Sequence, residues 1–419
     1  MSALSEELHW RHLVHQATDD HLFKLLDTES LTAYIGFDPT ADSLHVGNLL
    51  QLCNLRRLQG AGHRPIALAG GGTGMIGDPG GKSEERNLLT ADALAHNLAA
   101  IRVQLERFLD FSEGRALTAD NGEWLWDVRL LGFLRDIGKH FTVNQMVAKE
   151  SVKARFEGRD QGISYTEFSY MLLQAYDFLQ LFDRHGCRLQ LGGSDQWGNI
   201  TMGVELIRKQ RGETAFGLTS PLVVKADGTK FGKTESGTVW LDPAKTSPYR
   251  FFQFFINSED AVVGEYLRYF TWLSRDEIEA LDAETAEHPE RRAGQRALAR
   301  GVTALVHGAD EAERAERAAA VLFSEEIATL DEPTLLEVFA DAPSTTVPRE
   351  PIGLVDLLAL TGVCGSKSDA RRMVQQGGVY LNNRKQAEDG PVDPVADTLH
   401  GRYAVLRRGR KDHHLVRFE

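Results

Sequence analysis

The fold is decided by the stretch Thr32-Ala33-Tyr34-Ile35-Gly36-Phe37-Asp38-Pro39-Thr40-Ala41-Asp42-Ser43-Leu44-His45-Val46-Gly47-Asn48. It begins as a strand-like apolar run, turns through small residues from Pro39, and leads into a helix-like run, Leu49 to Leu58. A helix N-terminus offers unpaired backbone N–H groups and the positive end of the helix dipole. The stretch therefore predicts a strand, a turn and a helix that together hold phosphate groups.

A second loop carries positive charge suited to phosphate. It reads Lys230-Phe231-Gly232-Lys233-Thr234 and follows the turn signal Asp227-Gly228. Two lysines three residues apart on a glycine-containing loop supply mobile point charges. In this order, the two stretches resemble the HIGH and KMSKS signatures of class I aminoacyl-tRNA synthetases. Asn48 replaces the second His of the first signature, and Thr234 replaces the last Ser of the second.

The composition is that of an ordinary globular protein of two or three domains. The chain has 419 residues, of which 42% are hydrophobic and 26% are charged. It has no apolar run long enough for a membrane helix, and its polar N-terminus resembles no signal peptide. Its cysteines, Cys53, Cys187 and Cys364, show no metal-binding or redox spacing. We therefore expect a cytoplasmic protein with no metal centre of its own and no membrane partner.

Strand-like and helix-like runs alternate through residues 1–224, which predicts an α/β fold with a Rossmann-like parallel sheet covered by helices. Ligands of such sheets bind at the carboxyl ends of the strands. Residues 225–246 carry the second loop and a connection, and residues 247–330 show helical spacing alone, as expected of an all-helical domain. The clearest expected elements are strands at 64–69 and 188–191 and helices at 90–109, 166–182, 259–272, 275–285, 292–307 and 310–323.

The rest of the chain differs in composition and charge. Residues 331–350 are rich in proline and small polar residues, so we expect a linker there. Residues 351–419 are expected to form a small α+β domain, with 11 Lys and Arg against 8 Asp and Glu, a net charge of +3. The whole chain carries −13, which leaves −16 on the remaining residues. A basic domain on an acidic body suggests contact with a polyanion.

A glycine-rich loop follows the strand expected at 64–69. Gly72-Thr73-Gly74-Met75-Ile76-Gly77 matches the dinucleotide fingerprint, but the Asp78-Pro79-Gly80-Gly81 that follows would break the helix the fingerprint must open. The run from Gly77 to Ser83 is one residue too short between its glycines for a P-loop. We expect instead either a plain surface loop or a flexible loop that presents Asp78, Lys82 and Arg86 to a ligand.

An apolar helix carries three polar side chains on one face. Tyr170, Gln174 and Asp177 stand at helical spacing among neighbours that are almost all apolar. Because buried polar groups need partners, this face is either an internal hydrogen-bond network or a pocket for a small ligand with an amine and a hydroxyl.

Two further stretches have the chemistry of a ligand site. One face of the first strand carries, in alternation, Tyr34, Gly36 and Asp38. Gly36 lacks a side chain and lets a ligand lie close to the backbone. The stretch Gly192-Gly193-Ser194-Asp195-Gln196-Trp197-Gly198-Asn199 follows another strand, and its glycines admit a flat ring. Asp195 is a candidate acceptor for ribose hydroxyls, and Gln196 a candidate to orient a carboxylate.

These stretches, in this order, resemble the bacterial tyrosyl-tRNA synthetases over nearly the whole chain. The resemblance rests on Tyr34 through Thr40, His45 through Asn48, Tyr170 through Asp177, Gly192 through Asn199 and Lys230 through Thr234. It implies an enzyme that makes tyrosyl-adenylate and pyrophosphate from L-tyrosine and ATP with Mg²⁺, and then transfers tyrosine to the 3'-terminal adenosine of the tRNA specific for tyrosine. It also implies an anticodon-binding role for the helical domain and a homodimer, with an interface expected around residues 156–165.

The resemblance implies roles for individual residues at the matching positions. Tyrosine would contact Tyr34, Asp78, Tyr170, Gln174, Asp177 and Gln196, with Tyr34 and Asp177 on the phenolic hydroxyl. ATP would contact Gly36, Asp38, Thr40, His45, Gly47, Asn48, Gly193, Asp195 and Lys233. The groups that assist the reaction would be His45, Asn48, Lys82, Arg86, Lys230, Lys233 and Thr234.

The tail has a resemblance of its own. The run from Ser366 to Asn382 is similar to a small RNA-binding module first seen in a ribosomal small-subunit protein. It reads as a helix with adjacent arginines, a Gly377-Gly378 stop and a strand. Phosphate contacts are expected from Lys367, Arg371, Arg372, Arg407 and Arg408, with Arg384, Lys385, Arg410 and Lys411 as further candidates.

Two other functions stay open. A synthetase for tryptophan would share the signatures, although Tyr34 with Asp177 favours a ligand with a phenol hydroxyl. A catalytically silent RNA-binding protein would use the tail alone, although His45, Asp195 and the two lysines of the second loop would then have no use.

Overall fold

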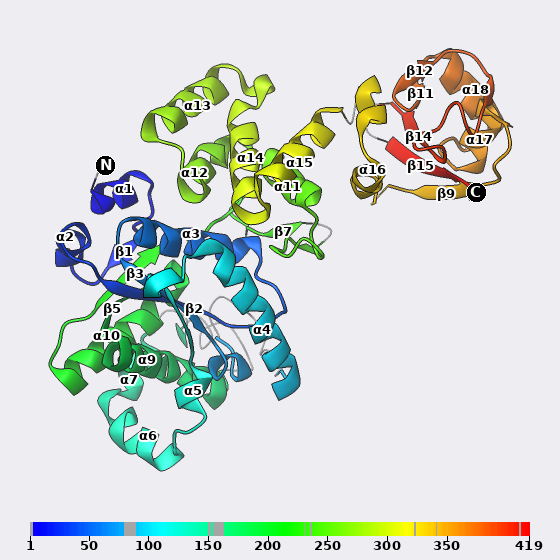
Figure 1. Ribbon diagram of the computed structural model, residues 1–419. Coiled ribbons are helices and arrows are strands. Elements are labelled where there is room, and N and C mark those ends of the chain that lie inside the picture. The colour runs from blue at the N-terminus through cyan, green and yellow to red at the C-terminus, as the bar shows by residue number, and fades with distance from the viewer. Residues whose placement is uncertain are drawn as a thin grey trace. The chain divides into compact units, whose positions relative to one another are not determined.

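A six-stranded sheet organises the first part of the chain (Figure 1). Its order is β1-β6-β5-β2-β3-β4, and all neighbours are parallel except β1, which runs antiparallel to β6. The strands are β1 Gln16–Ala17, β2 Thr32–Phe37, β3 Arg64–Ala69, β4 Leu117–Asp120, β5 Cys187–Gly193 and β6 Phe216–Ser220. The strand order reverses between β2 and β5, the place where open α/β sheets bind ligands. The predicted α/β fold is confirmed.

Helices cover both faces of this sheet. As a result, β3 is buried at every position from Pro65 to Ala69. The main helices are α3 Val46–Gly60, α4 Ala91–Phe108, α9 Tyr165–His185 and α10 Trp197–Arg211. The long α9 begins after Ser164, whose hydroxyl accepts from the Glu167 amide, and ends at Gly186 in the left-handed conformation. Side chains of α9 and α10 share one core with Tyr34 and Ile66.

The computed structural model describes residues 3–78, 89–149, 152–153, 163–229, 231–234, 237–321, 324–340, 342–409 and 412–419. The chain divides into two compact units, Met1–Thr246 with Ile256–Val306, and Ser247–Phe255 with His307–Glu419. Short elements complete them: α1 Leu4–Trp10, α2 His21–Thr28, α5 Gly122–Leu125, α6 Leu130–Asp136, α7 Val143–Val147, β7 Lys233–Thr234, β8 Gly237–Thr238, β10 Ile352–Gly353 and β13 Pro391–Val392. Within these ranges no helix is both long and apolar enough to span a membrane.

The helices expected between 247 and 330 are present, but they are divided between the two units. They are α11 Pro248–Ile256, α12 Asp260–Phe270, α13 Arg275–Glu287, α14 Ala293–His307 and α15 Ala309–Val321. Two buried arginines hold α12 in the first unit: Arg57 donates to Tyr269 O at 2.7 Å, and Arg11 donates to Arg268 O at 3.1 Å. The domain limits therefore differ from those expected, since these contacts are invisible to local spacing.

The second unit is built on a five-stranded sheet of order β12-β11-β14-β15-β9. Its strands are β9 Ser344–Val347, β11 Val379–Leu381, β12 Arg384–Gln386, β14 Tyr403–Arg408 and β15 Asp412–Phe418, and its helices include α16 Glu332–Val338, α17 Leu354–Leu360 and α18 Lys367–Gln375. The expected α+β character of the tail is thus present. The structure departs from the linker expected at 331–350, because α16 forms there and β9 pairs in parallel with β15.

Candidate active site

The N-terminus of α3 is closed by two side chains of the first signature. His45 is the N-cap, and its Nδ1 accepts from the Gly47 amide at 3.0 Å. Asn48 Oδ1 accepts in return from the His45 amide at 3.1 Å, which completes a capping box. Asn48 therefore has a structural role at the position where the signature usually has His. Gly47 and Thr40 are exposed beside this helix end, as a phosphate site requires.

The second loop lies against this helix end. The Val46 amide donates to Val239 O at 3.0 Å, and the Val239 amide donates to Gly232 O at 3.1 Å. Gly232 has φ +98°, and a side chain there would approach Val46 Cγ2 within 3.0 Å, so the close approach needs glycine. The two stretches paired in the sequence analysis are thus neighbours in space. Lys230 lies outside the described residues, and Lys233 and Thr234 are described only as backbone of β7.

The glycine-rich loop after β3 packs against the end of β2. Asp38 accepts from Thr73 Oγ1 at 2.8 Å and from Tyr170 OH at 3.0 Å. A side chain at Gly70 would meet Asp38 Oδ1 at 2.3 Å, so glycine is required for this contact. Through Asp78, where the described part of this loop ends, it forms a short 3-10 turn, Thr73–Met75, and not the long helix of a dinucleotide fingerprint. Lys82 and Arg86, expected on the same loop, lie outside the described residues.

An amide network joins three expected site residues. Gln196 Nε2 donates to Asp78 Oδ2 at 2.6 Å, and Gln174 Nε2 donates to Gln196 Oε1 at 3.2 Å. Asn199 Nδ2 donates to Gln174 Oε1 at 2.9 Å. Asn199 belongs to the quoted Gly192–Asn199 stretch but was not singled out as a site residue. The network spans three segments, so it fixes the positions of Asp78, Gln174 and Gln196 relative to one another.

The expected hydroxyl pair, Tyr34 and Asp177, is buried at the centre of the fold. The Tyr34 hydroxyl has no hydrogen-bond partner among the described residues. Asp177 Oδ2 accepts from Asn121 Nδ2 and its Oδ1 accepts from Trp124 Nε1, each at 2.8 Å. Burial raises the pKa of Asp177 to about 8, against the lowering effect of these two donors. Burial also holds the pKa of Tyr34 well above its usual value, with a further rise from the charge of Asp177.

Sequence reasoning missed Asn121 and Trp124. Asn121 is buried, and it also accepts from the Gly72 amide at 2.8 Å and donates to Thr73 Oγ1 at 2.8 Å, so it joins the glycine-rich loop to Asp177. No local pattern marks either residue, although Asn121 directly follows β4, and the carboxyl end of a strand is a recognisable position for a site side chain.

The remaining expected ATP residues lie at the carboxyl ends of β2 and β5. Gly36 is exposed on β2, and a Cβ built on it would meet nothing within 4 Å. Gly193 ends β5, and a side chain there would approach Asp195 Oδ1 within 2.6 Å. Asp195 itself is exposed. Gly36 thus borders open space beside the switch point between β2 and β5, whereas Gly193 packs closely against Asp195. Among the described residues, no group of three or more His, Cys, Asp or Glu is placed to hold a metal ion.

Comparison with known proteins agrees with this geometry. Residues 26–324 match the family described as tRNA synthetases class I (W and Y), and residues 334–416 match the tyrosine–tRNA ligase C-terminal domain. A tyrosine–tRNA ligase of Roseiflexus castenholzii is 54% identical over the whole of both chains, and one of Geobacillus stearothermophilus is 54% identical over 99% of each.

The chain belongs to the tyrosine–tRNA ligases.

A solved family member agrees with this. A C-terminally truncated mitochondrial tyrosyl-tRNA synthetase of Aspergillus nidulans has a TM-score of 0.69 and 31% identity, covering 77% of this chain and 95% of its own. The tryptophanyl-tRNA synthetase of Plasmodium falciparum, at 14% identity and a TM-score of 0.54, shares the fold alone. The two open alternatives, a tryptophan enzyme and a silent RNA-binding protein, are therefore not favoured.

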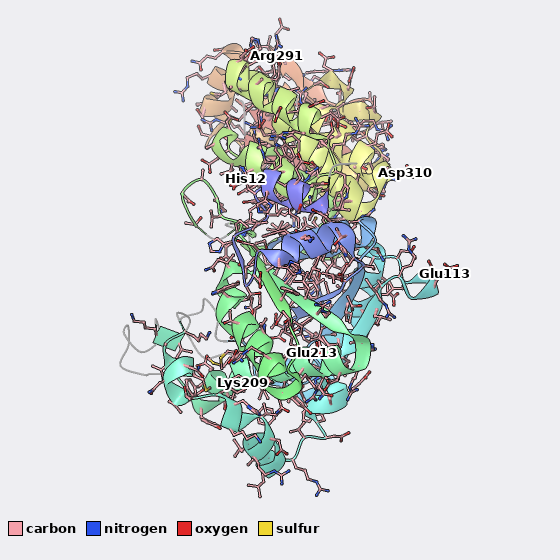
Figure 2. The ribbon with its side chains drawn as sticks, turned by 90° about the vertical axis from the view of Figure 1, so that its left-hand side faces the viewer. His12, Glu113, Lys209, Glu213, Arg291 and Asp310 are labelled. Carbon is pink, nitrogen blue, oxygen red and sulfur yellow. The ribbon has the colours of Figure 1, made fainter. Side chains whose placement is uncertain are left out.

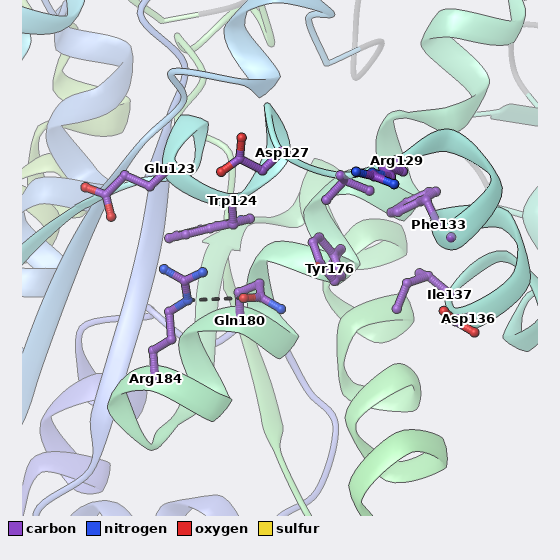
Figure 3. A pocket seen from close by; sticks show the side chains of 12 residues that line it. Glu123, Trp124, Asp127, Arg129, Phe133, Asp136, Ile137, Tyr176, Gln180 and Arg184 are labelled. Atoms are coloured by element: carbon purple, nitrogen blue, oxygen red, sulfur yellow. Dashed lines mark hydrogen bonds between the residues drawn. The ribbon is translucent and has the colours of Figure 1, made fainter.

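A cavity lies beside the indole ring that holds Asp177 in this ligase fold (Figure 3). It has a volume of about 380 Å³, and Trp124, Phe133 and Tyr176 contribute aromatic walls. Arg184 lies over the Trp124 ring, 5.0 Å from its centroid, and donates to Gln180 at 3.1 Å. Lys209 of α10, labelled in Figure 2, donates to His140 O at 2.7 Å and ties this helix to the segment that follows α6.

The tail arginines expected to meet RNA differ in exposure. Arg371 and Arg372 are exposed on α18, and Lys367 is exposed while it pairs with Asp356 at 2.8 Å. Arg407 is only 7% exposed, lies 3.7 Å from the Tyr380 ring centroid and donates to Gly409 O at 2.7 Å. The expectation for Arg407 does not fit the structure, since its guanidinium is committed to the interior. Arg410 and Lys411 lie outside the described residues.

Proposed function

We propose that the chain activates L-tyrosine with ATP and then transfers tyrosine to the 3'-terminal adenosine of its tRNA. The observation that carries the choice of amino acid is the buried hydroxyl of Tyr34, which has no partner among the described residues and lies near the carboxyl of Asp177. A phenolic hydroxyl between them would accept from one and donate to the other. Phenylalanine would leave the buried Tyr34 hydroxyl without a partner and would offer no hydroxyl to Asp177, which is costly.

The first step needs no protein nucleophile. The carboxylate of tyrosine is ionised, attacks the α-phosphorus of ATP and forms the acyl–phosphate bond as the bond to pyrophosphate breaks. The protein's part is to position the reactants and to stabilise the charge that moves onto the leaving phosphates. The helix end capped by His45 and Asn48 would contribute the positive end of its dipole, and Lys82, Arg86, Lys230, Lys233 and Thr234 would approach the pyrophosphate.

The amide network would hold the two ends of the amino acid backbone. Asp78, Tyr170 and Gln174 are proposed to bind the α-amino group, and Gln196 the carboxylate. Their fixed positions in the empty protein reduce the ordering needed on binding. Asp195 is proposed to accept from the ribose hydroxyls, with Gly36, Asp38, Thr40, Gly47 and Gly193 beside the nucleotide. Mg²⁺ would enter as part of the ATP substrate, held mainly by its phosphates and by water.

In the second step the tRNA must reach the adenylate, and the tail is proposed to hold the RNA. Lys367, Arg371, Arg372 and Arg408 are the proposed phosphate contacts, with Arg384 and Lys385 as further candidates. Because both substrates, ATP and tRNA, are cytoplasmic in bacteria, we also infer a cytoplasmic location.

A homodimer is proposed from the family and from an exposed apolar face. On α6, Leu130, Leu131 and Leu134 are 68%, 80% and 42% exposed, and Tyr165 is 70% exposed. Three exposed leucines on one short helix are typical of an interface. Residues 154–162, the rest of the expected contact region, lie outside the described residues. Leu131→Glu should give a monomer in sedimentation, whereas Val103→Glu, at an exposed apolar position on α4, should not. A dimeric Leu131→Glu protein would refute this face.

The test of the function is ATP–pyrophosphate exchange with each of the twenty amino acids. Exchange with tyrosine alone is expected. Exchange with tryptophan would keep the class and overturn the assignment of Tyr34 and Asp177. The absence of exchange with every amino acid would refute the synthetase proposal as a whole.

A further inference from the structure

The indole ring of Trp124 on α5 is held by two side chains of one helix, α9. Its Nε1 donates to Asp177 Oδ1 at 2.8 Å, and the guanidinium of Arg184 lies over the ring, 5.0 Å from its centroid. Asp177 and Arg184 stand seven residues apart, which places them on the same face of α9. This face therefore fixes the ring at two points, its N–H and one of its flat sides.

Arg184 covers an aromatic ring at the edge of the cavity beside α6. Trp124 is only 4% exposed, although it lines this cavity together with Arg184 (Figure 3). An arginine side chain can cover apolar surface with its stem while its charged head stays in water. The cover matters here, because water that reached the Trp124 N–H would compete with Asp177 for its hydrogen bond.

The charge of Arg184 has a defined place and acts inside the cavity. Its Nε donates to Gln180 Oε1 at 3.1 Å, one turn earlier on α9. Burial raises the pKa of the half-buried Tyr176, and the positive charge of Arg184 opposes that rise. Tyr176 itself packs edge to face on Phe133, with ring centroids 5.7 Å apart. Arg184 is thus a positive charge held over the indole of Trp124.

We propose that Arg184 is a positioning residue for the phenolic hydroxyl of tyrosine and acts through Trp124 on Asp177. A cation over an indole ring is attracted by the negative face of the ring and draws electron density toward itself. The N–H at the ring edge then becomes a stronger donor, and it holds the Asp177 carboxyl in one orientation. The inference rests on the proposed function, because Asp177 is a proposed contact of tyrosine.

Arg184→Met in the full chain tests the charge, since methionine keeps an unbranched side chain beside the ring. In ATP–pyrophosphate exchange the KM for tyrosine should rise about 2- to 5-fold, where the upper value corresponds to a whole cation–π contact at an exposed site. The KM for ATP and the rate at saturating tyrosine should not change. The KM for phenylalanine should not change either, because phenylalanine has no hydroxyl to position.

Two further variants separate the charge of Arg184 from a general disturbance. Arg184→Lys keeps a positive charge at the position and should recover part of the lost affinity for tyrosine. Arg188→Met is the matched control, because Arg188 of β5 also lies over an aromatic ring, 5.7 Å from the centroid of Phe216. This control should leave the KM for both amino acids unchanged.

The route through the indole is tested in a Trp124→Phe background, which keeps a ring and removes the N–H. There Arg184→Met should cause no further rise in the KM for tyrosine. The same rise with and without the Trp124 N–H would overturn the proposal, as would an Arg184→Met protein whose KM values for tyrosine and phenylalanine are both unchanged or rise equally. Absence of tyrosine-dependent exchange in the original chain would count against the proposed function instead.

Discussion

Replacing Tyr34 with phenylalanine removes one oxygen atom from the proposed tyrosine site and keeps the ring. The side chain is 1% exposed, and its ring centroid lies 5.3 Å from that of Phe178, so the ring should stay in place. The hydroxyl has no hydrogen-bond partner among the described residues. Without tyrosine this hydroxyl has no protein partner among those residues, whereas bound tyrosine would supply one.

Tyr34→Phe should therefore stabilise the protein without tyrosine and weaken the binding of tyrosine. A buried polar group without a partner costs about 1–3 kcal/mol, so Tyr34→Phe should raise the free energy of unfolding of the empty protein by up to that amount. A neutral hydrogen bond contributes about 0.5–1.5 kcal/mol, so tyrosine should bind roughly 2- to 13-fold more weakly. The preference for tyrosine over phenylalanine should narrow by a similar factor.

Urea unfolding of the empty protein and pyrophosphate exchange with tyrosine and phenylalanine measure both effects. Tyr176→Phe is the matched control, because it removes the same group from a residue that lines the cavity beside Trp124 and has no proposed contact with tyrosine. The control should leave the KM for tyrosine unchanged. A Tyr34→Phe protein that is less stable when empty, or that keeps its full preference for tyrosine, would refute the reasoning.

Three further predictions concern the same site. Asn121→Ala removes one hydrogen-bond partner from Asp177 and one from the Gly72 amide. The free energy of unfolding, measured in urea, should therefore fall by about 2–4 kcal/mol. The KM for tyrosine, measured by pyrophosphate exchange, should rise. Asn48→Ala breaks the capping box and should cost about 1 kcal/mol, whereas Asn48→Asp keeps the acceptor and most of the stability but should raise the KM for ATP. The pKa of Asp177 is about 8, far above its ordinary value of 3.8, so the folded chain holds a proton that the unfolded chain releases. Stability should therefore fall as pH rises from about 4 to 8, and Asp177→Asn should remove that fall in urea unfolding.

Each of these has an outcome that contradicts it. An Asn121→Ala protein with an unchanged KM for tyrosine would show that Asp177 does not depend on that amide. Equal stability of Asn48→Ala and the original chain would show that the capping box contributes nothing. The same pH profile for Asp177→Asn and the original chain would assign the titration to another group.

Much of the site was predictable because its signals are local. The strand, turn and helix at residues 32–60 follow from apolar periodicity, and the polar face of α9 follows from helical spacing. Asp78, Gln174 and Gln196, which are predicted to surround one ligand, are joined by hydrogen bonds, and their binding roles stay predictions. The resemblance to the family supplied the expected roles of these residues, which spacing alone left open.

The sequence by itself determined the class of fold, the order of the elements and the residues of the two signature stretches, since these depend on neighbours within one or two turns. The tertiary structure alone decided which groups surround Asp177, because Asn121 and Trp124 lie more than fifty residues away and meet it through packing. It also decided that β9 joins a sheet and that Arg407 is buried against Tyr380 across paired strands. Long-range pairing is set by how buried surfaces fit together, and no local propensity records that.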